Sequence, residues 1–174
     1  MPIYQLGDLV PVIHPDAYIH PEAVVIGDVT IGSESTVWPG AVLRGDYGTI
    51  TVGARTSVQD GTVVHAGPGF PTVIGNDCVI GHLAHLEGCT MEDGSLVGSG
   101  SVVLHHALIG AGATVGANAV VPNRMDVPPG SLALGVPAQI RPGRSDPELI
   151  RLSAQQYVAN GRRYRKALLR LDDR

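Results

Sequence analysis

Aliphatic side chains recur at every sixth position along most of the chain. This series of anchor positions runs from Ile13 to Leu43, Val52 to Val64, Ile74 to Leu86 and Met91 to Val121. The step is nine between 43 and 52, ten between 64 and 74, and five between 86 and 91. The residue two before each anchor is usually small. Because strand side chains alternate, each anchor and its small partner share one face, which we expect to point inward.

The repeat predicts a stack of short strands over roughly residues 13 to 140. Residues beside each anchor should point outward, and the second and third residues after it should form a turn. One such strand cannot bury its face alone, but a stack of them can. Cys78 and Cys89 both fall on the small inward position. We therefore expect them to pack in the core rather than to perform chemistry.

A helical pattern follows the repeat. Ser145 or Asp146 can cap it, and Pro147 suits the first turn. The predicted apolar stripe, which makes Gly161 a weak point, comprises Leu149, Leu152, Ser153, Gln156, Tyr157, Tyr164, Ala167, Leu168 and Leu171. The basic run Arg162, Arg163, Arg165 and Lys166 is interpreted as a solvated face. We expect a β-helix domain over residues 1–144 and a helix packed on it over 145–174.

Composition narrows the class of protein. The 174 residues include 23 glycines, 13 prolines and only 4% aromatic residues, which favours short strands and tight turns over a helix bundle. The net charge of −4 argues against nucleic acid or an anionic membrane as the main partner. We see no signal peptide, no apolar run of a spanning length and too few cysteines for a disulfide framework. A cytoplasmic protein is the expectation.

Counting along the repeat places polar residues in columns. Arg44, His65 and Glu87 each follow an anchor directly, and their separations of 21 and 22 equal one 18-residue coil plus the extra residues of the long steps. They should form one outward column, spaced by about 4.8 Å per coil. Asp60 and His82 each lie two residues after an anchor and should form a second column, at a corner.

These columns suggest a metal site that one chain cannot complete. His65 and Glu87 could share an ion, whereas His82 is roughly 16 Å along the strand from Glu87 at ~3.3 Å per residue. A zinc–nitrogen bond is only about 2.0–2.1 Å. A site using all three positions therefore implies a cyclic trimer in which a neighbour supplies His82. Ordinary surface histidines are the alternative that the spacing leaves open.

The motifs R-G-D (44–46), V-Q-D (58–60), I-G-H (80–82) and L-E-G-C (86–89), in this order, resemble the gamma-class carbonic anhydrase family. That resemblance implies an all-β left-handed parallel β-helix, a three-faced prism of hexapeptide repeats with a C-terminal α-helix. It also implies a homotrimer with zinc, iron or another divalent metal at each subunit interface. The first two histidine ligands of the family match His65 and His82. The third falls on Glu87, a departure from the family pattern.

The resemblance also assigns supporting roles. Arg44 and Asp60 match the pair that joins subunits and orders the site, and Asp46 matches the R-G-D aspartate. Gln59 matches the glutamine that positions the metal-bound water. The acidic proton-shuttle loop of active members is absent, because residues 66–71 read AGPGFP.

The implied activity is attack of metal-bound hydroxide on carbon dioxide to give bicarbonate. We expect it to be weak, given Glu87 and the missing acidic loop. His85 is displaced from the column by a strand repeat and is an alternative third ligand, a shuttle or a surface residue. Tyr164 is equally compatible with the site mouth and the core, and His105 and His106 are interpreted as surface residues. Two other functions remain open: a non-catalytic metal-binding scaffold, or a hexapeptide-repeat acyltransferase.

Overall fold

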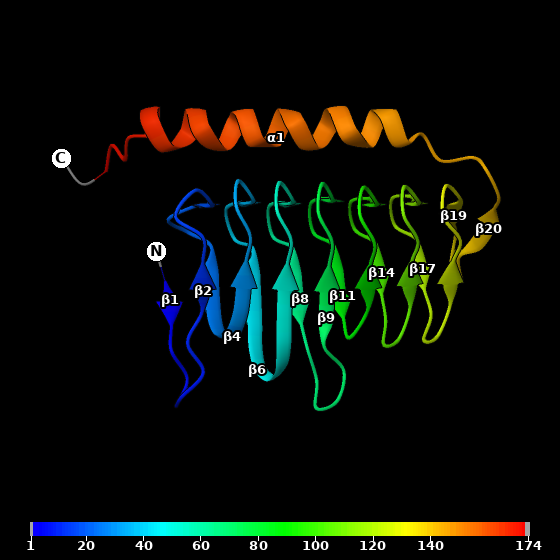
Figure 1. Ribbon diagram of the computed structural model, residues 1–174, viewed down its shortest axis with the longest axis horizontal. Helices are drawn as coiled ribbons and strands as arrows, with labels where there is room; N and C mark the ends of the chain where they lie inside the picture. The colour runs from blue at the N-terminus through cyan, green and yellow to red at the C-terminus, as the bar shows by residue number, and fades with distance from the viewer. Residues whose placement is uncertain (1, 173–174) are drawn as a thin grey trace.

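Short parallel strands wrap into a left-handed, three-faced solenoid in the computed structural model, which describes residues 2–172 (Figure 1). One sheet forms a flat face, called the helix face. Its strands are β3 (Tyr18–Ile19), β5 (Thr36–Val37), β7 (Ser57–Val58), β10 (Val79–Ile80), β13 (Leu96–Val97), β16 (Thr114–Val115), β19 (Leu132–Leu134) and the antiparallel β20 (Gln139–Arg141). The fold class predicted from the repeat and the family resemblance is confirmed.

A second sheet covers the other two faces, because β4 (Val24–Ile31) and β6 (Val42–Val52) run across the corner between them. The histidine face holds the starts of those two strands with β1 (Ile3–Tyr4), β8 (Val63–His65), β11 (His85–Glu87), β14 (Val102–Val103) and β17 (Val120–Val121). The third face holds their ends with β2 (Val12–Ile13), β9 (Thr72–Ile74), β12 (Thr90–Met91), β15 (Leu108–Ile109) and β18 (Asp126–Val127).

The core is the column of anchors and small partners that the sequence predicts. Leu43, Val64 and Leu86 are fully buried, and so are small partners such as Ala41 and Thr62. Cys78 and Cys89 are buried free thiols. Burial raises the pKa of both thiols, to about 12 for Cys89, so neither supplies a thiolate near neutral pH. The prediction of core packing for the cysteines is confirmed.

The predicted turns are present, and the third residue after an anchor often has a positive φ. Glycine adopts that left-handed conformation readily, and asparagine and aspartate do so more easily than most residues. Gly61 (66°), Asp77 (55°) and Asn118 (57°) follow this rule. Leu83 is an exception, since a bulky side chain takes φ 58° there and remains 72% exposed.

The extra residues of the ten-residue step form a loop over 66–71, which projects beyond neighbouring turns (Figure 1). It is closed by the Phe70 amide, which donates to the Gly67 carbonyl at 3.0 Å. The loop therefore lies between β8 and β9, next to the histidine face.

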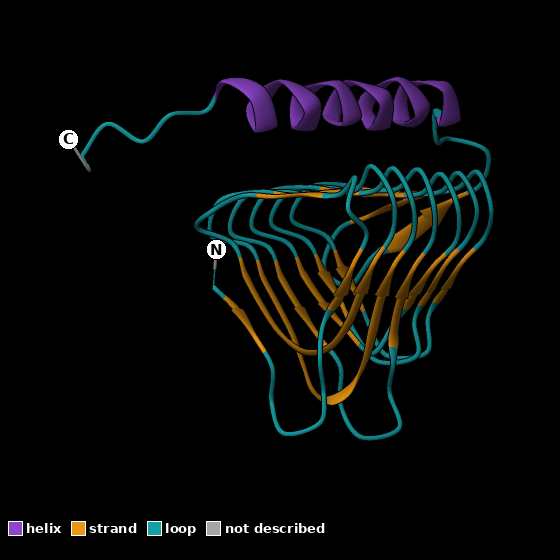
Figure 2. Ribbon diagram, turned by 60° about the vertical axis from the view of Figure 1, so that its left-hand side comes forward, coloured by secondary structure: helices purple, strands orange, loops and turns teal. Residues whose placement is uncertain are grey.

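Helix α1 (Pro147–Ala167) runs back along the helix face toward the first coils (Figures 1 and 2). Asp146 caps it by accepting from the Leu149 amide at 3.1 Å, and Pro147 opens its first turn, as predicted. The helix spans 21 residues, yet no helix within residues 2–172 has the length and apolar character needed to cross a membrane.

The predicted contact stripe of this helix is partly wrong. Leu149 and Leu152 are 59% and 50% exposed, whereas the buried positions are Ile150, Ala154 and Gly161. The helix docks on a flat sheet through small residues, with the side chains of Tyr157 and Tyr164 packed beside them on Trp38.

Gly161 is a point of close approach rather than a weakness. A Cβ there would lie 2.6 Å from Cγ2 of Thr36. The basic run beside it is not simply solvated, because Arg162 pairs with Glu34 and Arg165 donates to the Ala17 carbonyl at 2.6 Å. These contacts tie the end of the helix to the first coils.

Candidate metal centre

The predicted column on the histidine face exists. In the parallel strand register, Arg44 on β6 lies opposite His65 on β8, and His65 lies opposite Glu87 on β11. The register follows from the uniform coil, with the extra residues of the two long steps extruded at corners. The three side chains therefore project from adjacent parallel strands.

His65 lies between two carboxylates. Its Nδ1 is 2.9 Å from Oε1 of Glu87, and its Nε2 is 3.0 Å from Oδ1 of Asp46, which also bonds to Arg44. The His65 side chain is only 15% exposed. A neutral imidazole has one N–H and can donate to one of these carboxylates only. The second carboxylate therefore suits a cation bound at the other nitrogen.

Both carboxylates favour their charged forms. Burial raises the pKa of Asp46, but hydrogen bonds from His65 and Arg44 outweigh it and leave that pKa below its usual range. Hydrogen bonding to His65 lowers the pKa of Glu87 against partial burial, and His105 and His85 lower it further. Negative charge on both sides of His65 attracts a cation.

Two more histidines reach Glu87. His85 Nε2 is 3.3 Å from Oε2, and His105 Nε2 is 3.5 Å from Oε1. The sequence predicted His105 to be a surface residue, and its side chain is 35% exposed, but the prediction missed its contact with Glu87. Glu87 lies one residue after its anchor and His105 lies two after its own, so a comparison of identical repeat positions missed the contact. The side chain of His105 reaches back across one coil.

A buried threonine fixes the backbone of this column. The hydroxyl of Thr72 donates to the His65 carbonyl at 2.5 Å and accepts from the Gly88 amide at 2.8 Å. Thr72 lies on an inward position of β9 and is fully buried. It therefore links the ends of β8 and β11, which carry His65 and Glu87.

The second predicted column is also present. His82 Nδ1 is 2.8 Å from Oδ2 of Asp60, and each side chain is 49% exposed. A carboxylate at Nδ1 favours the tautomer that leaves a free lone pair on Nε2, as second-shell carboxylates do for metal-binding histidines. Within one chain Asp60 thus meets His82, while Arg44 meets Asp46.

Gln59 is buried beside this corner and hydrogen bonds to Tyr157 of α1. Burial and the nearby Asp60 charge raise the pKa of Tyr157, although the Gln59 hydrogen bond lowers it. Tyr164 instead packs on Trp38, with ring centroids 5.0 Å apart. The helix tyrosine next to the candidate residues is therefore Tyr157, which the sequence suggested only as part of the apolar stripe.

The two columns do not combine within one chain. Among residues 2–172, no group of three or more His, Cys, Asp or Glu side chains is placed to hold a metal ion. The donors nevertheless suit zinc, which accepts imidazole and carboxylate ligands. When a nitrogen and an oxygen each lie about 2.0–2.2 Å from a tetrahedral zinc ion, these two ligand atoms are about 3.3–3.5 Å from each other. The 2.9 Å between His65 Nδ1 and Glu87 Oε1 needs only a small expansion to reach that spacing.

Comparison with known proteins places the chain in a family. The model of the bacterial transferase hexapeptide family (six repeats) matches residues 11–45, 71–105 and 88–123. Carnitine operon protein CaiE of Escherichia coli K12 is 39% identical over 90% of this chain and 81% of its own length. Gamma carbonic anhydrase 2, mitochondrial, of Arabidopsis thaliana is 38% identical over 87% of this chain, which spans 57% of that protein.

A solved structure agrees with these relatives. The hexapeptide transferase family protein from Anaplasma phagocytophilum superposes with a TM-score of 0.89 and 35% identity, covering 94% of this chain and 98% of that one. The chain therefore belongs to the bacterial transferase hexapeptide family, with gamma carbonic anhydrases and CaiE among its relatives, as the sequence motifs predicted.

Proposed function

We propose that the protein is a gamma-carbonic-anhydrase-like metalloprotein that hydrates carbon dioxide slowly, using a site shared between neighbouring copies in a trimer. The observation that carries this proposal is the imidazole of His65 held between the carboxylates of Glu87 and Asp46. The relatives named as gamma carbonic anhydrases support it.

His65 and Glu87 of one chain and His82 of a neighbour would hold a divalent metal, with zinc the best match to two imidazoles and a carboxylate. Such a metal would make coordinated water acidic near neutral pH. Asp46 would accept a hydrogen bond from the Nε2–H of His65 and leave Nδ1 for coordination. Asp60 would do the same at Nδ1 of His82 and leave Nε2.

Exposed apolar side chains next to both columns support the trimer. Val63 on β8 is 38% exposed and Leu83, directly after His82, is 72% exposed. Apolar surface beside a half-buried charged pair is typical of a subunit interface core with a polar surround. Arg44 and Asp60 are proposed to pair across this interface. A monomer in light scattering at micromolar concentration would defeat both the trimer and the shared site.

Gln59, fixed by Tyr157, would orient the attacking water. His85 is the exposed group closest to Glu87 that could pass a proton to buffer, since its side chain is 37% exposed and the loop over 66–71 contains no acid. A carboxylate ligand reduces the net positive charge of the centre and makes bound water less acidic than three histidines do. We therefore expect slow hydration that improves at alkaline pH.

Metal analysis of protein purified without chelators, with a carbon dioxide hydration assay, tests the proposal. We expect about one metal ion per chain and a rate that chelation abolishes. Bound metal without hydration would instead support a non-catalytic scaffold.

Substitution at Glu87 identifies the third ligand. Glu87→Ala should lose metal, because it removes a donor that adjoins His65, while the matched variant His85→Ala should retain it. Glu87→His should restore the family ligand set and raise the hydration rate. Full metal occupancy in Glu87→Ala together with loss in His85→Ala would assign the ligand to His85.

Acyl transfer is the second candidate, since the Anaplasma phagocytophilum relative is named as a hexapeptide transferase family protein. An acyl-CoA thermal-shift screen separates the two functions. Stabilisation by acyl-CoA in a chain that binds no metal would favour the transferase.

A further inference from the structure

Phe70 and His105 form a stacked pair beside the proposed metal ligand Glu87. Their ring centroids are 5.2 Å apart with an interplanar angle of 20°, and His105 Nε2 lies 3.5 Å from Oε1 of Glu87. Phe70 comes from the loop over 66–71, and His105 comes from the coil after β11. Phe70 thus packs on His105, which in turn contacts the carboxylate of Glu87.

Gly88 makes this meeting possible. It has φ 60°, and a Cβ there would lie 2.8 Å from Cβ of Phe70 and 3.1 Å from Cδ2 of His105. The Gly88 carbonyl also accepts from the His106 amide at 2.6 Å. A side chain at position 88 would push Phe70 and His105 away, so the backbone next to Glu87 is shaped to admit them.

We propose that His105, held by Phe70, is a positioning residue that orients Glu87 for metal binding. This inference rests on the proposed function. A glutamate side chain has three rotatable bonds, and fixing it before the metal arrives reduces the entropy lost on binding. A carboxylate oxygen has two lone pairs, so Oε1 can accept an N–H from His105 and still offer a pair to a cation.

His106 is a natural control for this role. It meets the same Phe70 ring edge-on, with centroids 4.8 Å apart and an angle of 78°. Unlike His105, it is exposed, and within residues 2–172 it forms no ion pair with a carboxylate. Replacing His106 perturbs the environment of Phe70 without touching the contact to Glu87.

The experiment measures zinc affinity of the full-length protein by competition with a chromophoric chelator. His105→Ala should weaken zinc binding by about 10–100-fold, the usual effect of removing an outer-shell partner. His105→Gln should recover part of this loss because its amide can donate to Glu87. Phe70→Leu should weaken binding less than His105→Ala does, and His106→Ala should leave affinity unchanged.

A double-mutant cycle separates positioning from general structural damage. In a Glu87→Ala background, adding His105→Ala should cause no further loss of residual zinc affinity. Equal zinc affinity in His105→Ala and the parent, or an undiminished loss in the Glu87→Ala background, would overturn the positioning role. A parent protein that binds no zinc would overturn the proposed function and this inference with it.

Discussion

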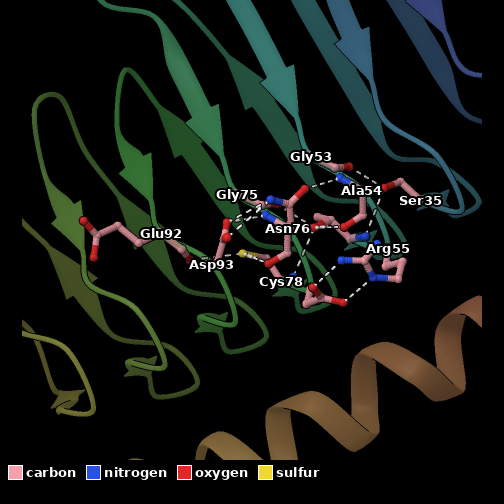
Figure 3. A network of polar contacts seen from close by, with 11 residues as sticks. Ser35, Gly53, Ala54, Arg55, Gly75, Asn76, Cys78, Glu92 and Asp93 are labelled. Carbon is pink, nitrogen blue, oxygen red and sulfur yellow. Dashed lines mark hydrogen bonds and ion pairs between the residues drawn. The ribbon is translucent and has the colours of Figure 1, made fainter.

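Two corner columns occupy the same place in the repeat, two residues after an anchor, yet differ in their partners. The asparagine corner consists of Ala54, Asn76 and Asp93, and the histidine corner consists of Asp60 and His82. In the asparagine corner, Asn76 Oδ1 accepts from the Ala54 amide at 2.8 Å, and Asp93 Oδ1 accepts from the Asn76 amide at 2.7 Å (Figure 3). The side chains of Asn76 and Asp93 thus each accept from a backbone amide of the previous coil.

The histidine corner does not work in this way. The bond between His82 and Asp60 joins two side chains that are each half exposed. A short amide or carboxylate at this position can reach a backbone N–H of the previous turn, whereas the larger imidazole ring instead meets the side chain of Asp60. A residue at this repeat position has a structural role when its side chain accepts a hydrogen bond from a backbone amide. It is a candidate for function when its side chain instead bonds to another titratable side chain at the surface.

The largest expected effect concerns the histidine corner. Asp60→Ala should weaken trimer assembly by about 3–5 kcal/mol if its charge is desolvated against a neighbour, since the loss leaves a charge unpaired. The isolated chain should lose only about 0.2–1 kcal/mol, because the pair is half exposed there. Light scattering on dilution and thermal unfolding measure the two quantities. A variant that remains fully trimeric would show that the pairing across the interface is misassigned.

The asparagine corner should behave in the opposite way. Asn76→Ala removes the acceptor of the Ala54 amide and the side-chain amide that donates to Asp93, while the backbone amide of residue 76 can still donate to Asp93. We expect the variant to lower the free energy of unfolding by about 1–3 kcal/mol. Zinc affinity should be unchanged. Denaturant unfolding with chelator competition checks both expectations, and a loss of zinc binding without destabilisation would contradict the contrast between the corners.

The smallest effect concerns the thiols. Burial raises the pKa of Cys78, next to the asparagine corner, and that of Cys89 to about 12. An unfolded thiol ionises near pH ~8.5. Because the folded chain keeps the thiol protons at a pH where the unfolded chain loses them, the free energy of unfolding should decrease as the pH rises above that value. Below it the thiols are protonated in both states, and their contribution to stability does not change with pH.

Thiol reagents at pH 8 should accordingly react with both cysteines only as fast as the chain opens. Asn76→Ala should accelerate the reaction of Cys78 more than that of Cys89. Cys78 lies in the same turn, with its Sγ 3.4 Å from the carbonyl of residue 76, and loss of the Asn76 side chain loosens that turn. Equal acceleration at both thiols would indicate global rather than local opening.

Features set by counting were predictable from the sequence. The positions of Arg44, His65 and Glu87 in one column, and of Asp60 next to His82, follow from separations along the chain, because each coil keeps 18 residues in register and extrudes the extra residues of the long steps at corners. The burial of Cys78 and Cys89 follows from the same count. The roles of these side chains in metal binding remain predictions.

Contacts that depend on the reach of a side chain or on the docking of the helix were not predictable from the sequence. His105 contacts Glu87 although the two residues occupy different positions in their repeats. Tyr157, rather than Tyr164, lies beside Gln59. The helix also turns Ile150 and Ala154, not Leu149 and Leu152, toward the prism. In each case the contact depends on the distance between two elements that are far apart in sequence.

The sequence by itself determined the coil, its register, its inward residues and the family, because a period of six with short-range strand alternation leaves few other arrangements. Only the tertiary structure decided which polar groups meet: Asp46 at the second nitrogen of His65, Phe70 against His105, and Gly161 against Thr36. Those meetings depend on loop shape and on space left by glycine, which a repeat pattern does not encode.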